Sequence, residues 1–205
     1  MSLGPWVYVF SGLNNEGIQG QEYRYEVRDV VSVTGEHRLN FGRGENLLRV
    51  ETSAPLPAVQ AEKARWRGVV RHLQYTSEEL RKELTAQSAK EYASSDKTMA
   101  VFIPIRKSAA WWSLAQDARQ EHFHKKTSGS NHSSVGLRYA DKIYRKLYHA
   151  RYFDTLPDYD FLTYFEFKEE DAGIFRSLLK DLRDPELNQE WKFVEMETEV
   201  WTVKK

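Results

Sequence analysis

Cysteine is absent from this chain of 205 residues. Its absence excludes disulfide bonds, cysteine-ligated zinc, iron–sulfur clusters and cysteine nucleophiles. The chain also lacks an excess of charge of either sign, because 30 Lys and Arg residues balance 30 Asp and Glu residues. Proteins that bind nucleic acid usually carry a clear basic excess, so we expect no nucleic-acid partner.

Long apolar segments are missing as well. No run approaches the roughly 20 residues of a membrane-spanning helix. The first residues, Met1 to Asn14, lack the basic segment of a secretory signal. We therefore expect no membrane partner and a cytoplasmic location, with a periplasmic one if a signal has been removed. Aromatic residues, in contrast, make up 13% of the chain, which is typical of a folded protein.

The residue pattern is clearest in the second half of the chain. Met99–Ile105 is a continuous apolar run, which predicts a buried strand, and Ser108 can cap a helix that continues to about Phe123. A loop is expected over residues 125–133. The elements expected after it are strands at 143–151 and 160–167, an amphipathic helix at 169–182 and a strand at 193–203. The order β-α-β-β-α-β is that of a ferredoxin-like unit.

The first half predicts a reduced version of the same unit. Its expected strands cover residues 6–10, 23–33, 47–50 and 66–75, and a capping box at Thr76 predicts a helix to about Gln87. An open sheet with helices on one face must cover its other face, and a second such sheet can do so. We therefore expect an α+β barrel of two ferredoxin-like halves, residues 1–98 and 99–205, in one compact unit.

Arg145 is an unusual residue within the strand expected at 143–151. Period-two alternation places it on the same face as Ile143 and Leu147. Because an unpaired buried charge is costly, the guanidinium must be paired or must face a cavity that holds an anion. The alternative is an edge strand whose face is wet.

The histidines give no decision by themselves. His122 and His124 would diverge by about 200° on a helix, which makes them a poor metal pair. His132, taken alone, is a loop residue. Likewise Trp111 is expected in the core and Glu190 at the surface.

Five motifs follow one another with consistent spacing in the second half of the chain: Phe102–Trp112, Gly136–Tyr139, Tyr144–His149, Asp160–Glu166 and Glu190–Glu195. In these motifs the chain resembles the chlorite dismutase family. The similarity is strong over about residues 66–203 and looser over the first 65, and the chain looks like the short, dimeric branch of the family. The family's fold, a dimeric α+β barrel, agrees with the order of elements above.

The resemblance implies haem b bound in the second half of the chain. The family's proximal iron ligand precedes a distal arginine by thirteen residues, which matches His132 and Arg145. His124 is the weaker alternative ligand. By similarity the carboxylate that orients the ligand is Glu190, with Glu186 as a second candidate.

Four further residues match family positions around the haem. Tyr75, Lys107 and Trp111 match positions that contact the haem or its propionates. Gln87 resembles the residue that hydrogen-bonds the distal arginine.

The implied activity is the conversion of chlorite to chloride and dioxygen, with O–O bond formation at a ferric/ferryl haem in a homodimer. Arg145 favours this chemistry over that of the related coproheme decarboxylases, which generally carry an uncharged residue at this position. Two functions without catalysis also compete with it: haem binding or storage, and an interaction role for a haem-free barrel.

Overall fold

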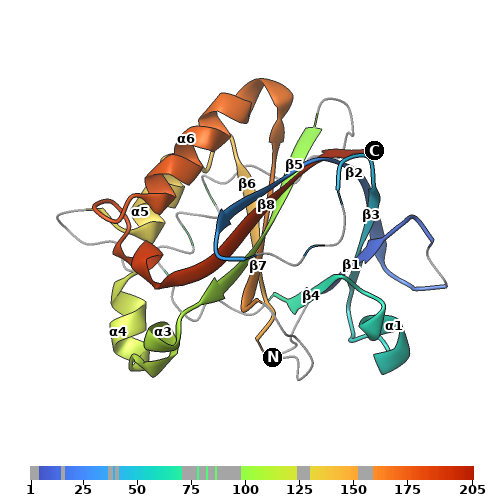
Figure 1. Cartoon of the computed structure of the whole chain (residues 1–205), viewed down its shortest axis with the longest axis horizontal. Coiled ribbons are helices and arrows are strands. Elements are labelled where there is room, and N and C mark those ends of the chain that lie inside the picture. The colour runs from blue at the N-terminus through green and yellow to red at the C-terminus, as the bar shows by residue number, and fades with distance from the viewer. Residues whose placement is uncertain are drawn as a thin grey trace.

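Eight antiparallel strands close into one barrel, in the order β1-β3-β2-β8-β5-β7-β6-β4 (Figure 1). The computed structural model describes residues 5–14, 17–36, 39, 42–70, 78, 82, 86, 98–123, 130–151 and 159–205. The strands are β1 (Trp6–Ser11), β2 (Gln21–Thr34), β3 (Asn46–Thr52), β4 (Trp66–Val69), β5 (Thr98–Lys107), β6 (Tyr144–His149), β7 (Phe161–Lys168) and β8 (Val194–Lys204).

Short helices connect these strands. They are α1 (Ala58–Glu62), α3 (Ala109–Ser113), α4 (Gln116–Glu121), α5 (His132–Leu137) and α6 (Ala172–Arg183), with 3₁₀ turns η1 (Glu169–Asp171) and η2 (Gln189–Phe193). In Figure 1, α5 and α6 lie beside the β5–β8 part of the barrel and α1 lies near β1 and β4. None of the helices in the described part of the chain is both long and apolar enough to cross a membrane.

The two halves of the chain arrange their strands alike. The second half runs β8-β5-β7-β6 around the barrel, and the first half runs β4-β1-β3-β2. If the four strands of each half are numbered along the chain, their spatial order is therefore 4-1-3-2 in both halves. The halves join edge to edge through β2–β8 and β4–β6. The expected barrel and the mixed α+β content are confirmed.

Alternation along β5 divides the core into an inner and an outer cluster. Ala100 and Phe102 point into the barrel, whereas Val101 and Ile103 pack outward. Phe175 of α6 is fully buried against the outer side, where its ring stacks on Phe167 with the centroids 4.4 Å apart. The predicted apolar face of this helix is confirmed, and it fixes α6 against the sheet.

The single helix expected from Ser108 to Phe123 is wrong. Ser108 caps α3 as predicted, but the backbone at Leu114 and Ala115 is extended, and α4 starts afresh. The break lets the ring of His122 lie 5.7 Å from the ring of Trp111. In a straight helix, residues eleven positions apart would be separated by about 16 Å.

The loop expected over residues 125–133 extends too far. His132 and Ser133 form the first turn of α5, which a capping box begins. The Asn131 side chain accepts a hydrogen bond from Ser134 N at 3.0 Å, and Asn131 N donates to Ser134 Oγ at 2.8 Å. Asn131 therefore fixes the start of the helix that carries His132.

Other expected boundaries change less. The strand predicted at 66–75 is β4 over its first four residues, and residues 71–75 lie outside the described part of the chain, as does most of the helix expected at 76–87. The connection expected at 152–159 is described only at Tyr159. Among the predicted site residues, Tyr75, Gln87 and His124 lie outside the described residues.

Candidate functional site

A cavity lies between the outer face of the second-half strands and the helices that cover it. The cavity opens to solvent. The strand wall carries mainly apolar side chains, among them Ile103, Ile105, Leu147, Phe161, Thr163, Phe165 and Val194. The helical side contributes His132, Leu179, Leu182, Arg183, Asn188, Glu190 and Trp191.

His132 projects from the first turn of α5 into this cavity. Its ring packs against Phe123, with the centroids 5.0 Å apart. The Nδ1 atom lies 2.6 Å from Glu190 Oε2. The Nε2 atom is buried and has no hydrogen-bond partner among the described residues. An orphaned imidazole nitrogen at a cavity wall is the arrangement expected of a metal ligand.

Glu190 joins His132 to Lys107. Its second carboxylate oxygen pairs with the Lys107 ammonium, and both side chains are buried. Lys107 reaches this place because the β5–β8 register shifts between Arg106 and Lys107, and such a bulge re-aims a side chain. Glu186, the second candidate, is exposed. The structure therefore brings Glu190, and not Glu186, against His132.

Burial and pairing shift the pKa values of Glu190 and His132. Desolvation would raise the pKa of the Glu190 carboxyl, but Lys107 and His132 outweigh it and hold that pKa well below its usual value. Desolvation lowers the pKa of His132, and the opposing effect of Glu190 is smaller. The site thus favours a neutral imidazole beside an ionised carboxylate, and the neutral imidazole is the form that binds iron.

Arg145 lines the same cavity from β6. Its side chain is exposed and faces the cavity. No carboxylate of the described residues lies within ion-pair distance of its guanidinium. The sequence allowed a paired arginine, a cavity arginine or a wet edge, and the structure places Arg145 at the cavity. A guanidinium there is a permanent cation for a small anion.

Trp111 is fully buried and stands behind the cavity wall. The Lys107 ammonium lies 5.1 Å from its ring centroid, and the rings of Phe123 and Phe193 pack around it. Trp111 therefore supports Lys107 and Phe123, both of which line the cavity. The structure brings together five of the predicted site residues: His132, Glu190, Lys107, Arg145 and Trp111.

Sequence reasoning missed the cavity residues on α6 and β8. Arg183 ends α6, and its guanidinium pairs with Glu197 Oε1 at 2.9 Å. Both line the cavity. A basic residue in the last turn of a helix is normally a solvated cation that complements the helix dipole. No local pattern in the sequence indicates this pair, because a glutamate that alternates with apolar residues in a strand is normally solvated.

Comparison with known proteins agrees with this geometry. The sequence profile of the family described as "Chlorite dismutase" matches residues 46–200. The chain belongs to the chlorite dismutase family.

Individual relatives cover different shares of the chain. Chlorite dismutase of Ideonella dechloratans is 32% identical over 116 residues, which are 56% of this chain and 37% of that protein. The chain thus spans well under half of that relative. A crystal structure of dimeric chlorite dismutases from Nitrobacter winogradskyi is 30% identical, with a TM-score of 0.71, over 97% of this chain and 99% of that one.

A more distant structure shares the fold. A variant of chlorite dismutase from Candidatus Nitrospira defluvii is 18% identical, with a TM-score of 0.67, over 98% of this chain and 90% of the other. The barrel and its strand order are therefore common to relatives that differ widely in sequence.

Proposed function

We propose that this protein is a haem b enzyme that converts chlorite to chloride and dioxygen. One observation carries the proposal: a buried imidazole with an orphaned Nε2 and an arginine without a described carboxylate partner face the same cavity. Membership of the chlorite dismutase family supports it. We infer further that each half of the barrel is a ferredoxin-like unit.

The residues around the cavity fit a haem. A single imidazole suits an iron whose in-plane ligands come from a porphyrin. The apolar side chains of β5, β6 and β7 suit the faces of a macrocycle. His132 would hold the iron, and Glu190 would orient His132.

When bound, haem would supply an iron centre for oxygen-atom transfer from chlorite and for formation of the O–O bond. The protein's own residues control what surrounds that chemistry. Glu190 Oε2 lies 2.6 Å from His132 Nδ1, and a proton kept on Nδ1 by this carboxylate would leave Nε2 unprotonated and raise the basicity of the ring. The Lys107 ammonium pairs with the Glu190 carboxylate, so the buried site does not contain an unpaired negative charge.

Arg145 acts on the substrate side. Chlorite and the chlorine oxyanion left after oxygen transfer are both small anions. A guanidinium cannot lose its proton near neutral pH, so it attracts chlorite and holds the second anion until the O–O bond forms. Loss of that anion would release hypochlorite, which is a strong oxidant of aromatic and sulfur side chains.

We also infer a homodimer, because the relative from Nitrobacter winogradskyi is described as dimeric and is aligned with this chain over nearly its whole length. Sedimentation of the haem-loaded protein tests this inference. A single species at twice the mass of the chain is expected, and a monomer at micromolar concentration would contradict it.

The deciding experiment is to reconstitute the protein with haem b and to record dissolved oxygen on addition of chlorite. Prompt oxygen release in proportion to the chlorite consumed is expected. A haem absorption band without oxygen release would contradict the activity and leave a haem-handling role, such as storage or coproheme decarboxylation. Failure to bind haem would contradict the cofactor as well and would favour an interaction role.

A further inference from the structure

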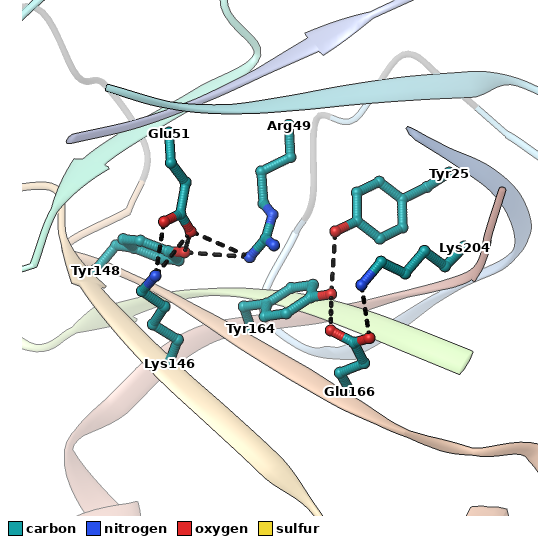
Figure 2. A network of polar contacts seen from close by, with 8 residues as sticks. All are labelled: Tyr25, Arg49, Glu51, Lys146, Tyr148, Tyr164, Glu166 and Lys204. Carbon is teal, nitrogen blue, oxygen red and sulfur yellow. Dashed lines mark hydrogen bonds and ion pairs between the residues drawn. The ribbon is translucent and has the colours of Figure 1, made fainter. Parts of the chain in front are cut away.

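The inside of the barrel contains many polar and charged side chains, although it is a closed core. Figure 2 shows tyrosines, carboxylates and cations that point toward one another; they come from β2, β3, β6, β7 and β8. Tyr25, Tyr148, Tyr164, Arg49 and Glu166 are fully buried. Ion pairs buried this deeply add little stability compared with well-packed apolar residues. Such a cluster is therefore better explained by a chemical role than by stability.

Tyr164 lies in the middle of a directed chain of hydrogen bonds. Its hydroxyl donates to Glu166 Oε2 at 2.7 Å. The same hydroxyl lies 3.0 Å from the hydroxyl of Tyr25. Because a phenol has one proton and Tyr164 gives its own to Glu166, Tyr25 is the donor in the second bond. Protons can thus shift in one direction, from Tyr25 to Tyr164 to Glu166 (Figure 2).

Lys204 supports Glu166 as the proton acceptor of this chain of hydrogen bonds. Its ammonium donates to the other carboxylate oxygen, Oε1, at 2.8 Å. The pairing gives the fully buried Glu166 carboxylate a cationic partner. Oε2 is therefore held as an acceptor that faces the Tyr164 hydroxyl.

Burial also prevents the phenols from ionising by themselves. Desolvation is the main cause that raises the pKa of Tyr164 well above its ordinary value, and the same is true of Tyr148. Their hydroxyls keep their protons at any physiological pH. A proton can leave such a group readily only when an electron leaves with it.

The tyrosines stand directly behind the strand wall of the cavity. On β7, Thr163 and Phe165 line the cavity, and Tyr164 between them points into the barrel. On β6, Leu147 lines the cavity, and its neighbour Tyr148 points inward. One layer of strands therefore separates Tyr164 from whatever occupies the cavity.

We propose that Tyr164 and Tyr25 form a redox-active pair that removes a surplus oxidising equivalent from the cavity. The oxidant is a strong one-electron oxidant held there, which in this protein is the oxidised haem centre, so the inference rests on the proposed function. Tyr164 gives one electron to the oxidant and its phenolic proton to Glu166, and becomes a neutral radical. The oxidant is reduced by one electron.

The radical then moves by exchange of a hydrogen atom. Tyr25 gives an electron and its hydroxyl proton to Tyr164 across the 3.0 Å contact, which restores Tyr164 and leaves the radical on Tyr25. A small reductant such as ascorbate returns the electron, and the proton on Glu166 goes back through Tyr164. The pair thus diverts oxidation from Trp191, which lines the cavity.

Electron paramagnetic resonance tests the assignment directly. The haem-loaded protein is mixed with one equivalent of peracetic acid, frozen within milliseconds, and compared with protein that carries ring-deuterated tyrosine. A neutral tyrosyl signal that narrows on deuteration is expected. It should be lost in Tyr164→Phe. In Tyr25→Phe it should persist with altered hyperfine structure, because the radical stays on Tyr164.

Tyr8 provides the matched control. It is as buried as Tyr164, but its hydroxyl accepts a hydrogen bond from the backbone N–H of Leu56 and lies in a different cluster. The Tyr8→Phe variant should keep the full signal. A tyrosyl signal that survives Tyr164→Phe unchanged, or one that Tyr8→Phe removes, would overturn the assignment. Because Tyr25→Phe leaves the Glu166 contact in place, it remains informative if Tyr164→Phe folds poorly.

A second experiment separates this inference from the proposed function. The haem-free chain is oxidised by photogenerated ruthenium(III) tris-bipyridine in solution. The longest-lived radical should again depend on Tyr164, whether or not the protein turns over chlorite. Oxygen release from chlorite without any Tyr164-dependent radical would overturn the inference and leave the proposed function intact. A Tyr164-dependent radical in a chain that binds no haem would support the redox pair and contradict the proposed cofactor.

Discussion

His132 Nδ1 lies 2.6 Å from Glu190 Oε2, although one residue opens α5 and the other lies in η2 just before the last strand. This contact links the two segments that close the helical side of the cavity. Because Glu190 also pairs with Lys107 at the end of β5, one carboxylate ties together three distant parts of the chain, α5, η2 and β5. Substitutions at the ligand and at this carboxylate should therefore both change haem binding.

Replacing His132 by alanine should abolish stable haem binding, because Nε2 is the orphaned nitrogen at the cavity wall. Titration with haem b, followed by the Soret band, measures the effect. The His124→Ala variant is the comparison, since His124 is the alternative ligand within the same part of the sequence. An unchanged Soret band in His132→Ala, together with its loss in His124→Ala, would reverse the ligand assignment.

Replacing Glu190 by glutamine keeps the size of the side chain and removes the charge that supports His132. Haem affinity should fall roughly 10–100-fold, as is typical when a residue that orients a metal ligand is changed. Glu186→Gln is a matched control, because Glu186 is exposed and only four positions away. Equal haem affinities in the two variants would show that the contact with His132 has no role in binding.

Replacing Arg145 by glutamine should leave haem affinity nearly unchanged and shorten the active life of the enzyme with chlorite. Without the guanidinium, hypochlorite escapes before the O–O bond forms and attacks the protein. Arg145→Lys keeps a cation but loses the planar fork, so its effect should be intermediate. Oxygen yield is measured with and without a hypochlorite trap, and a trap that protects neither variant would contradict the retention role.

Much of the barrel was predictable because local patterns specify it. Alternation along β6 correctly separated Arg145 and Leu147 from the residues that point inward. Helical spacing predicted that Phe175 and Leu179 face the sheet. In both elements one face is buried and the other is not, so the periodicity of apolar side chains predicts which residues point inward.

Features that depend on long-range contacts were not predictable. The break between α3 and α4 accompanies the packing of Trp111 against His122. This contact joins residues eleven positions apart, and no local pattern in the sequence predicts it. Residues such as Arg49 and Glu51 look like solvated strand positions, yet both lie inside the barrel, where each satisfies the other's charge. For the site, the family resemblance indicated Glu190, and periodicity could not, because its partners come from other elements.

The barrel interior gives a prediction on the stability of the protein in acid. Glu51 is buried and accepts hydrogen bonds from Lys146 Nζ at 2.7 Å and Tyr148 OH at 2.6 Å. Burial alone would raise the pKa of this carboxyl, but Arg49, Lys146 and Tyr148 together hold it below its ordinary 4.5. The unfolded chain therefore binds a proton at Glu51 more readily than the folded barrel does.

The contribution of Glu51 to stability is complete above the unfolded pKa and is lost as the pH falls through the lower folded value. Urea unfolding at a series of pH values should show the free energy of unfolding falling below about pH 4.5. At neutral pH, Glu51→Gln should cost about 3–5 kcal/mol, because it removes the buried carboxylate that pairs with Arg49 and Lys146. In acid, the free energy of unfolding of this variant should fall less steeply with pH than that of the wild type. In contrast, Glu22→Gln should change little, because Glu22 pairs with the exposed Arg24 at 3.6 Å. If the free energy of unfolding fell equally steeply with pH in the wild type and in Glu51→Gln, this carboxylate would not control the loss of stability in acid.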